Sequence, residues 1–203
     1  DIKLKRKPHL FKNKLKEFTN LGKFNTNYIL NKYGENLCTY SYYDRPVRSR
    51  LKCTFQEFFN IHYNTCYTFT RSIFDINNTS NKNSIINEIN YPNKFFNANE
   101  IDKYIFYCGK EKSGCLPHSH GAALNLMSYG RKYWIFFDSL TKKGEEFENY
   151  FYNKYPLNNQ WINWYNNEYK NLCNSVEVIE FIQESNDIIY IPNNYNHTVY
   201  NLR

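Results

Sequence analysis

The second half of the chain consists of short apolar runs separated by turn residues. The runs are rich in β-branched and aromatic residues, and Gly, Ser or Asn residues separate them. Runs of this kind, repeated at close spacing, predict the strands of a sandwich or barrel. They cover Tyr104–Cys108, Ala122–Tyr129, Lys132–Phe137, Val176–Gln183, Asp187–Ile191 and His197–Leu202. We therefore expect a mainly β fold.

One segment of this half, Glu145–Leu172, has helical spacing instead. Its residues Trp161, Trp164, Tyr165 and Tyr169 follow one another at i, i+3, i+4 and i+8, which places them on one face of a helix. An aromatic stripe of this kind is typical of a helix that packs on a core, and we interpret it so rather than as a cofactor site. We expect peripheral α-helices beside the strands.

The first half of the chain carries weaker signals. Thr54–Glu57 has the pattern of a capping box that begins a short helix. Tyr67–Thr70 alternates like a strand, and the polar, asparagine-rich segment Asp75–Glu100 predicts a long surface loop. Because no repeat or linker interrupts the chain, we expect a single domain over 1–203. Its lead-in would be 1–103 and its barrel core 104–203.

Composition and charge exclude several classes of protein. Aromatic residues make up 19% of the 203 residues, which argues against a disordered chain. The net charge is +7, and seven Lys or Arg residues lie among the first 16. We interpret this stretch as a basic, mobile arm, and contact with nucleic acid or chromatin through it stays open. The six cysteines have neither CxxC nor zinc spacing, so we expect mostly buried thiols.

The sequence contains no membrane segment. No apolar run reaches the roughly 18–20 residues that a transmembrane helix requires. Charged residues at the start are not followed by an apolar stretch, so no signal peptide is expected there. The compartment and the oligomeric state stay open.

Three of the five histidines lie in two short segments of the β-rich half. On an extended strand His118 and His120 would point to the same face, about 6.5–7 Å apart. His197 follows a turn at Pro192–Asn194, where asparagine tolerates the left-handed conformation. If the two segments are neighbouring strands, three imidazoles share one point, as in a catalytic metal site with open positions. An H-x-H pair in a strand is also common as a structural or surface pair.

The residues around these histidines resemble known motifs. Gly114-x3-His118-x-His120-x4-Asn125-x4-Gly130 resembles the first cupin motif, and Pro192-x-Asn194-x2-His197-x3-Asn201 resembles the second. Gly130–Phe137 is similar to the G-x-K-x-W strand of JmjC-domain proteins, and Asn186–Pro192 and His197–Leu202 are similar to their closing strands. The resemblance covers about residues 104–203 and is closest to small JmjC proteins with an H-x-H-G motif.

The resemblance implies a double-stranded β-helix, that is, a jelly-roll or cupin barrel of eight strands with peripheral α-helices. It implies Fe(II) as cofactor, 2-oxoglutarate as cosubstrate and a protein substrate whose side chains are hydroxylated or whose lysines are demethylated. By position, the metal ligands would be His118, His120 and His197. Lys132 would bind the distal carboxylate of 2-oxoglutarate, and the other residues of that pocket would be Asn125, Cys115, Tyr107 and Asn201.

His120 departs from the pattern of the iron oxygenases, which have a carboxylate at this position. No Asp or Glu lies between Lys112 and Phe137 that could replace it. Three hypotheses therefore stay open: an Fe(II)- and 2-oxoglutarate-dependent oxygenase, an inactive JmjC-like metal-binding or protein-interaction module, and a cupin metalloenzyme without 2-oxoglutarate. Lys132 favours the first over the third, because only an oxoacid pocket requires a buried cation there.

Overall fold

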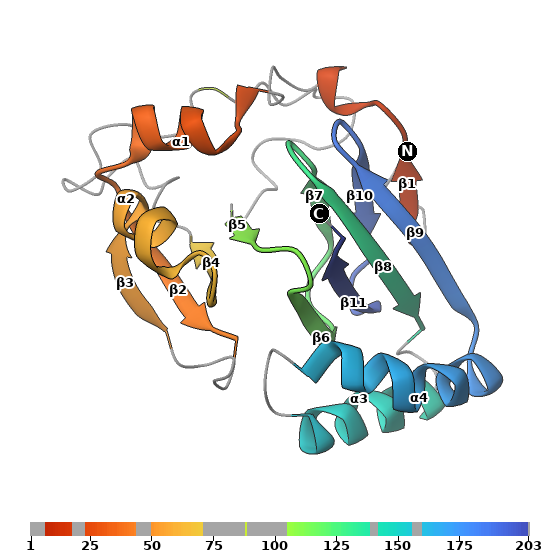
Figure 1. Cartoon of the computed structure of the whole chain (residues 1–203). Helices are drawn as coiled ribbons and strands as arrows, with labels where there is room; N and C mark the ends of the chain where they lie inside the picture. Colours follow the sequence, from red (N-terminus) through yellow and green to blue (C-terminus); the bar gives the residue numbers. More distant parts are fainter. Residues whose placement is uncertain are drawn as a thin grey trace.

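Two antiparallel sheets face each other and form the core of the molecule (Figure 1). The computed structural model describes residues 7–17, 23–43, 50–70, 88, 105–138, 142–155 and 160–202. One sheet has four strands in the order β6 (Gly114–His118), β11 (Asn196–Asn201), β8 (Arg131–Phe137) and β9 (Val178–Glu184). The other has three, in the order β1 (His9–Phe11), β10 (Ile188–Ile191) and β7 (Ala123–Leu126). The predicted mainly β jelly-roll fold is confirmed, with seven strands in these sheets over the described residues.

The space between the two sheets is filled by alternate residues of the strands. Trp134 and Phe136 of β8 pack with Ile189 and Ile191 of β10, and Tyr195 completes this cluster. Because side chains alternate along a strand, the residues between them face the other way. The four-stranded sheet therefore has an inner face toward the barrel and an outer face toward the helices.

Two helices cover the outer face: α3 (Lys142–Lys154) and α4 (Trp161–Ser175). The predicted stripe lies on α4, where Trp161 and Trp164 are buried in one cluster with β8, and Tyr165 and Tyr169 pack against it. The indole of Trp161 donates to Thr198 Oγ1 over 2.7 Å, and its ring stacks on Tyr200. The interpretation of the stripe as core packing is confirmed, while the single helical segment is two helices.

The first half of the chain forms a third antiparallel sheet beside the barrel (Figure 1). Its order is β3 (Leu51–Thr54), β2 (Leu37–Tyr42), β4 (Cys66–Thr70) and β5 (Phe106–Gly109). Helices α1 (Thr26–Tyr33) and α2 (Phe55–Glu57) and the π-helical turn η4 (Phe58–His62) pack with it. The capping box is confirmed, since Thr54 and Glu57 bond reciprocally. The predicted Asn-rich loop lies outside the described residues, Glu88 excepted.

The prediction of buried thiols holds only in part. Cys38 and Cys66 are buried, Cys173 is exposed, and the other three cysteines are partly exposed. Most of the thiols are therefore not fully buried. Cys53, Cys108 and Cys115 lie on β3, β5 and β6, each of which is an edge strand of its sheet.

The basic N-terminal segment belongs to the fold over residues 7–17. β1 pairs with β10, and the short 3-10 turn η2 (Leu15–Glu17) follows it. Asp187 accepts hydrogen bonds from Lys12 Nζ and from the backbone N–H of Asn13, each over 2.9 Å. The expectation of a mobile arm is therefore wrong for these residues. Lys7 and Lys12 are both paired with acidic groups of the same chain.

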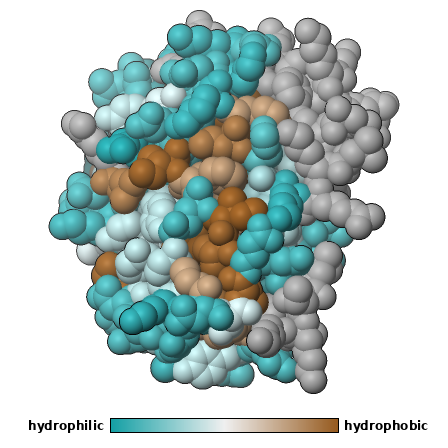
Figure 2. All heavy atoms as spheres, turned by 90° about the vertical axis from the view of Figure 1, so that its right-hand side faces the viewer, coloured by the Kyte–Doolittle hydropathy of each residue, from teal (hydrophilic) through white to brown (hydrophobic). Residues whose placement is uncertain are grey.

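β1 and β9 are the edge strands on the same side of the barrel (Figure 1). Leu10 of β1 and Ile179 and Phe181 of β9 pack against the same core. On this side of the molecule, apolar residues gather in a band that polar side chains border (Figure 2). The ion pairs Lys7–Glu177 and Lys12–Glu184 join residues that flank or end the two strands. Among the described residues, no helix has the length and apolarity to cross a membrane.

Candidate metal centre

His118 and His197 lie directly opposite each other on β6 and β11. The next paired residues are Cys115 and Val199. Between the two pairs β6 therefore advances by three residues and β11 by two. This is a one-residue bulge. Cys115 and His118 are three positions apart, which on a regular strand would place them on opposite faces, and the bulge brings both to the same face. The sequence pattern assumed a regular strand here, and the bulge is what it did not predict.

His120 lies beyond the end of β6, yet its ring reaches the other two histidines. The ring centroids are 4.6 Å apart for His120 and His197, 5.6 Å for His118 and His120, and 4.3 Å for His118 and His197. One ring nitrogen of each residue lies within 4.8 Å of the others. His197 is buried, His118 is partly buried and His120 is exposed. The predicted histidines are therefore brought together at one point.

Each of the three rings is held by a backbone carbonyl. Nδ1 of His118 lies 2.8 Å from Leu116 O, Nδ1 of His120 lies 2.7 Å from Gly121 O, and Nδ1 of His197 lies 2.9 Å from Tyr195 O. A carbonyl oxygen only accepts, so each Nδ1 donates and carries the ring proton. Nε2 is then the basic nitrogen, which is how metal-binding histidines are oriented by their surroundings.

Electrostatics favour the neutral form of two of these rings, His197 and His120. Burial lowers the pKa of His197 well below its ordinary value, and the neighbouring His118 lowers it further. Partial burial also lowers the pKa of the His120 ring. A neutral imidazole is the form that binds a metal ion. Three neutral imidazoles suit a divalent first-row ion such as Fe(II), and they leave its charge uncompensated.

The turn before His197 connects the two motif segments. Asn194 has a φ of 56°, in the left-handed region, as the sequence predicted for this position. Its backbone N–H donates to the carbonyl of His120 over 2.9 Å. The turn therefore fixes the loop that carries His120, although His120 is not on a strand.

The inner face of the four-stranded sheet is polar at both ends and apolar in the middle. His197, Phe136 and Ile179 form one row across β11, β8 and β9, and Val199, Trp134 and Phe181 form the next. The third row is Asn201, Lys132 and Gln183. Four residues separate the first row from the third, which is roughly 13 Å along the strand.

Lys132 is a cation in an apolar and aromatic setting. Its Nζ lies 4.2 Å from the centroid of the Tyr107 ring. Burial lowers the pKa of Lys132 to about 8, and Cys108 and Cys115 partly offset this effect. Among the residues that the structure describes, no carboxylate lies within ion-pair distance of it. The groups that act on its charge among the described residues are the Tyr107 ring and the thiols of Cys108 and Cys115.

The other predicted pocket residues have different surroundings. Cys115 Sγ lies 3.5 Å from His118 Nδ1. Burial raises the pKa of this thiol, but His118 and Lys132 lower it by more, so that it falls below its ordinary value. Asn125 is buried on β7 opposite Ile189, on the face that Ala123 turns to the core.

Asn201 is used by the neighbouring turn. Its Nδ2 donates to Ser113 Oγ over 2.8 Å and lies 3.3 Å from the carbonyls of Gly109 and Lys110. The structure thus places Asn201 beside Lys132 in the third row, with its amide engaged in joining β11 to the turn between β5 and β6.

Sequence reasoning missed Gln183 and Cys108. Gln183 is fully buried in the third row, and Cys108 faces the Lys132 charge closely enough to affect its pKa. No motif marks either residue. The alternation of β9 was the available signal for Gln183, because it places a polar residue on the inner face.

Comparisons with known proteins bear on the fold. No protein-family model matches the chain, and no curated protein matches it. The structure is similar to two solved structures of YcfD, a ribosomal oxygenase from Escherichia coli, one of them in complex with cobalt and succinic acid. The TM-scores are 0.55 and 0.53, with 12% and 13% identity over 97% of this chain. The chain spans 45% of the length of the YcfD chains, and the likeness shows a shared fold.

Proposed function

We propose that the protein is an Fe(II)- and 2-oxoglutarate-dependent oxygenase that acts on a protein substrate. Its metal ligands would be His118, His120 and His197, and Lys132 would bind the distal carboxylate of the cosubstrate. Hydroxylation of a side chain is favoured over lysine demethylation. Contact with nucleic acid or chromatin through the first 16 residues stays a prediction, and three lysines of that stretch, Lys7, Lys12 and Lys14, are engaged in ion pairs.

The observation that carries the proposal is the convergence of three histidines with the same ring orientation. All three use Nδ1 to donate to a carbonyl, and one nitrogen of each lies within 4.8 Å of the others. A structural histidine needs a partner for one nitrogen, whereas three rings that each donate Nδ1 to the backbone and bring one nitrogen to a common point match a metal site.

Lys132 supports the choice of a dicarboxylate. A cation that is partly removed from water is costly unless an anion compensates it, and Lys132 is partly buried with no anion in its row among the described residues. Cobalt and succinic acid are bound by YcfD, which has a similar fold at 12% identity. Succinate is the product that 2-oxoglutarate leaves after oxidative decarboxylation, and Co(II) is a common substitute for Fe(II).

The residues of the proposed site would have different roles according to their position. Fe(II) with 2-oxoglutarate supplies the activation of O2 that hydroxylation requires. The histidines would hold one end of the site, and Lys132 would bind the carboxylate at the other. Trp134 and Phe136, which contact His197 with ring centroids 5.9 and 5.8 Å away, would exclude water between them.

An anaerobic titration tests this proposal. Metal-free protein would receive Fe(II) and then 2-oxoglutarate, and the weak visible charge-transfer band of the chelate would be recorded. We expect the wild type to show the band and Lys132→Ala to lose it at the same cosubstrate concentration. The proposal fails if the wild type binds Fe(II) without any band at saturating 2-oxoglutarate.

A second candidate is a JmjC-like module that binds a metal or a partner without turnover. His120 favours it, because an imidazole leaves the metal at +2 where a carboxylate would reduce that charge. The variant His120→Asp separates the two candidates. If only this variant shows the band, the natural site serves binding rather than oxidation.

A further inference from the structure

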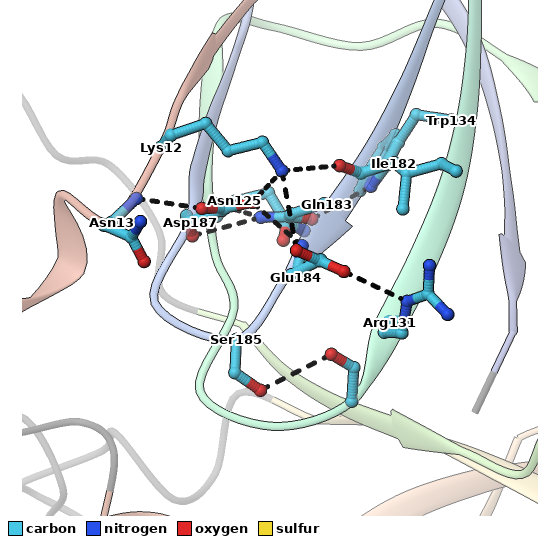
Figure 3. Close-up of polar contacts among 11 residues, drawn as sticks. Lys12, Asn13, Asn125, Arg131, Trp134, Ile182, Gln183, Glu184, Ser185 and Asp187 are labelled. Atoms are coloured by element: carbon cyan, nitrogen blue, oxygen red, sulfur yellow. Dashed lines mark hydrogen bonds and ion pairs between the residues drawn. The ribbon is translucent and has the colours of Figure 1, made fainter.

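Gln183 connects the two sheets of the barrel at the end where Lys132 lies. Its side chain is fully buried on the inner face of β9, directly opposite Lys132 of β8. Its Oε1 accepts from the indole N–H of Trp134 over 2.9 Å. Its Nε2 donates to the carbonyls of Asn125 over 3.0 Å and Asp187 over 3.3 Å (Figure 3).

These three bonds reach three different parts of the barrel. Trp134 belongs to the four-stranded sheet, Asn125 belongs to β7 of the opposite sheet, and Asp187 precedes β10. An indole N–H only donates and a carbonyl only accepts, so the orientation of the Gln183 amide is determined by its partners. The amide therefore links the two sheets in this part of the barrel.

The turn that Gln183 contacts is itself held firmly. The carboxylate of Asp187 accepts from Lys12 Nζ, from the N–H of Asn13 and from the N–H of Glu184, each over 2.9 Å (Figure 3). The residues after the N-terminal strand thus hold the turn at Asp187 through hydrogen bonds to its carboxylate. Gln183 bonds to the same turn and to the indole of Trp134.

We infer that Gln183 is a positioning residue that holds the opposite sheet at the distance that leaves room for a dicarboxylate over the inner face between His197 and Lys132. Trp134 contacts His197, with ring centroids 5.9 Å apart, and lies two residues from Lys132. Gln183 therefore acts at both ends of the site through residues beside it. This inference rests on the proposed function, because it needs a ligand that spans the two ends.

The test compares metal affinity with dicarboxylate affinity in the whole chain. Gln183→Met removes all three hydrogen bonds with a side chain of similar length. Ile135→Val is the control, since Ile135 is buried on the outer face of β8, away from the site. Calorimetry would measure the binding of Co(II), and then of 2-oxoglutarate to the Co(II)-loaded protein. The indole N–H resonance of Trp134, assigned with Trp134→Phe, would report the lost bond.

We expect Gln183→Met to bind Co(II) within about threefold of the wild type and 2-oxoglutarate at least about tenfold more weakly. The Trp134 resonance should shift in this variant and stay in place in Ile135→Val, which should bind both ligands normally. General destabilisation would not separate the two affinities. If Gln183→Met does not fold, Trp134→Phe keeps an aromatic ring at this position and removes one bond, and about a threefold loss of 2-oxoglutarate affinity is expected.

Two results would overturn the inference. Equal 2-oxoglutarate affinity in the wild type and in Gln183→Met, or in Trp134→Phe where that variant replaces it, refutes the positioning role and leaves the proposed function intact. A wild type that binds Co(II) and no 2-oxoglutarate refutes the proposed dicarboxylate site, and the positioning role fails with it.

Discussion

His118 and His197 are register partners on β6 and β11, and their ring centroids lie 4.3 Å apart. The pairing brings two segments that are distant in the sequence to one point of the barrel. A one-residue bulge beside it also turns Cys115 inward, toward Lys132. The proposed metal site is therefore built from backbone pairing, with His120 added from a loop.

This arrangement predicts unequal contributions of the histidines to metal binding. His118→Ala and His197→Ala should each lower Co(II) affinity by at least about a hundredfold, because strand pairing holds these rings in place. His120→Ala should lower it by about tenfold, because this exposed ring must be ordered on binding. Visible absorption of bound Co(II) would measure the affinities.

The control for this series is His62→Ala. His62 stacks on Tyr40 in the first half of the chain and should have no effect on Co(II) binding. Equal losses in His62→Ala and His197→Ala would contradict a site at the three histidines.

The binding of 2-oxoglutarate should weaken at alkaline pH. Burial lowers the pKa of Lys132 to about 8, so its cation is present below that pH and is lost above it. Since the dianion binds the protonated form, affinity should fall by up to about tenfold per pH unit above pH 8. The groups around Lys132 are Tyr107 and Cys108 of β5 and Cys115 of β6. Calorimetry from about pH 6.5 to about pH 9.5, roughly 1.5 units on either side of this pKa, would record the profile.

Lys132→Arg is the matched variant for the pH series. An arginine stays charged throughout this range, so its affinity should change much less with pH. A wild-type profile as flat as that of Lys132→Arg would exclude titration of Lys132 as the cause.

Gly114 should not tolerate a side chain. A Cβ at this position would lie 2.7 Å from Val199 O and 3.0 Å from the ring of Trp161. Gly114→Ala should therefore force β6 away from β11 or α4 and lower the free energy of unfolding by about 2 kcal/mol. Urea unfolding would measure it. Gly121→Ala serves as the control, because its Cβ would meet Asn193 Oδ1 only at 3.9 Å, an ordinary contact. Equal stability of the two variants would contradict the close packing at Gly114.

The attachment of the N-terminal strand should depend on Asp187 more than on surface pairs. Asp187 is buried and accepts three hydrogen bonds, so Asp187→Ala should lower the free energy of unfolding by about 2 to 3 kcal/mol. Lys7→Ala breaks an exposed ion pair with Glu177 and should have no measurable effect on urea unfolding. Similar values for both variants would show that residues 7–17 contribute little through Asp187.

Several elements of the fold were predictable because their signals are local. The apolar runs that became β8, β9 and β10, the capping box at Thr54–Glu57 and the stripe on α4 each depend on residues close in the sequence. The left-handed Asn194 also follows from a short turn. The three histidines could be singled out because two motifs surround them.

Other features were not predictable because they depend on partners far along the chain. The three-residue strand β1 forms only because β10 and Asp187 offer backbone and carboxylate partners. In the sequence alone, where the edge of β10 is not visible, the first 16 residues have the pattern of a charged arm. The role of Gln183 has the same origin, since its three partners come from three different segments.

The sequence by itself determined the β-rich class, the helical stripe and the residue types of the site, because period and spacing are properties of neighbouring residues. The tertiary structure decided the bulge in β6, the position of His120, the placement of Lys132 over the Tyr107 ring and the use of Asn201 as an anchor for a turn. Each of these depends on which backbone or side chain lies opposite. Pairing between distant strands, which no local pattern contains, supplies that information.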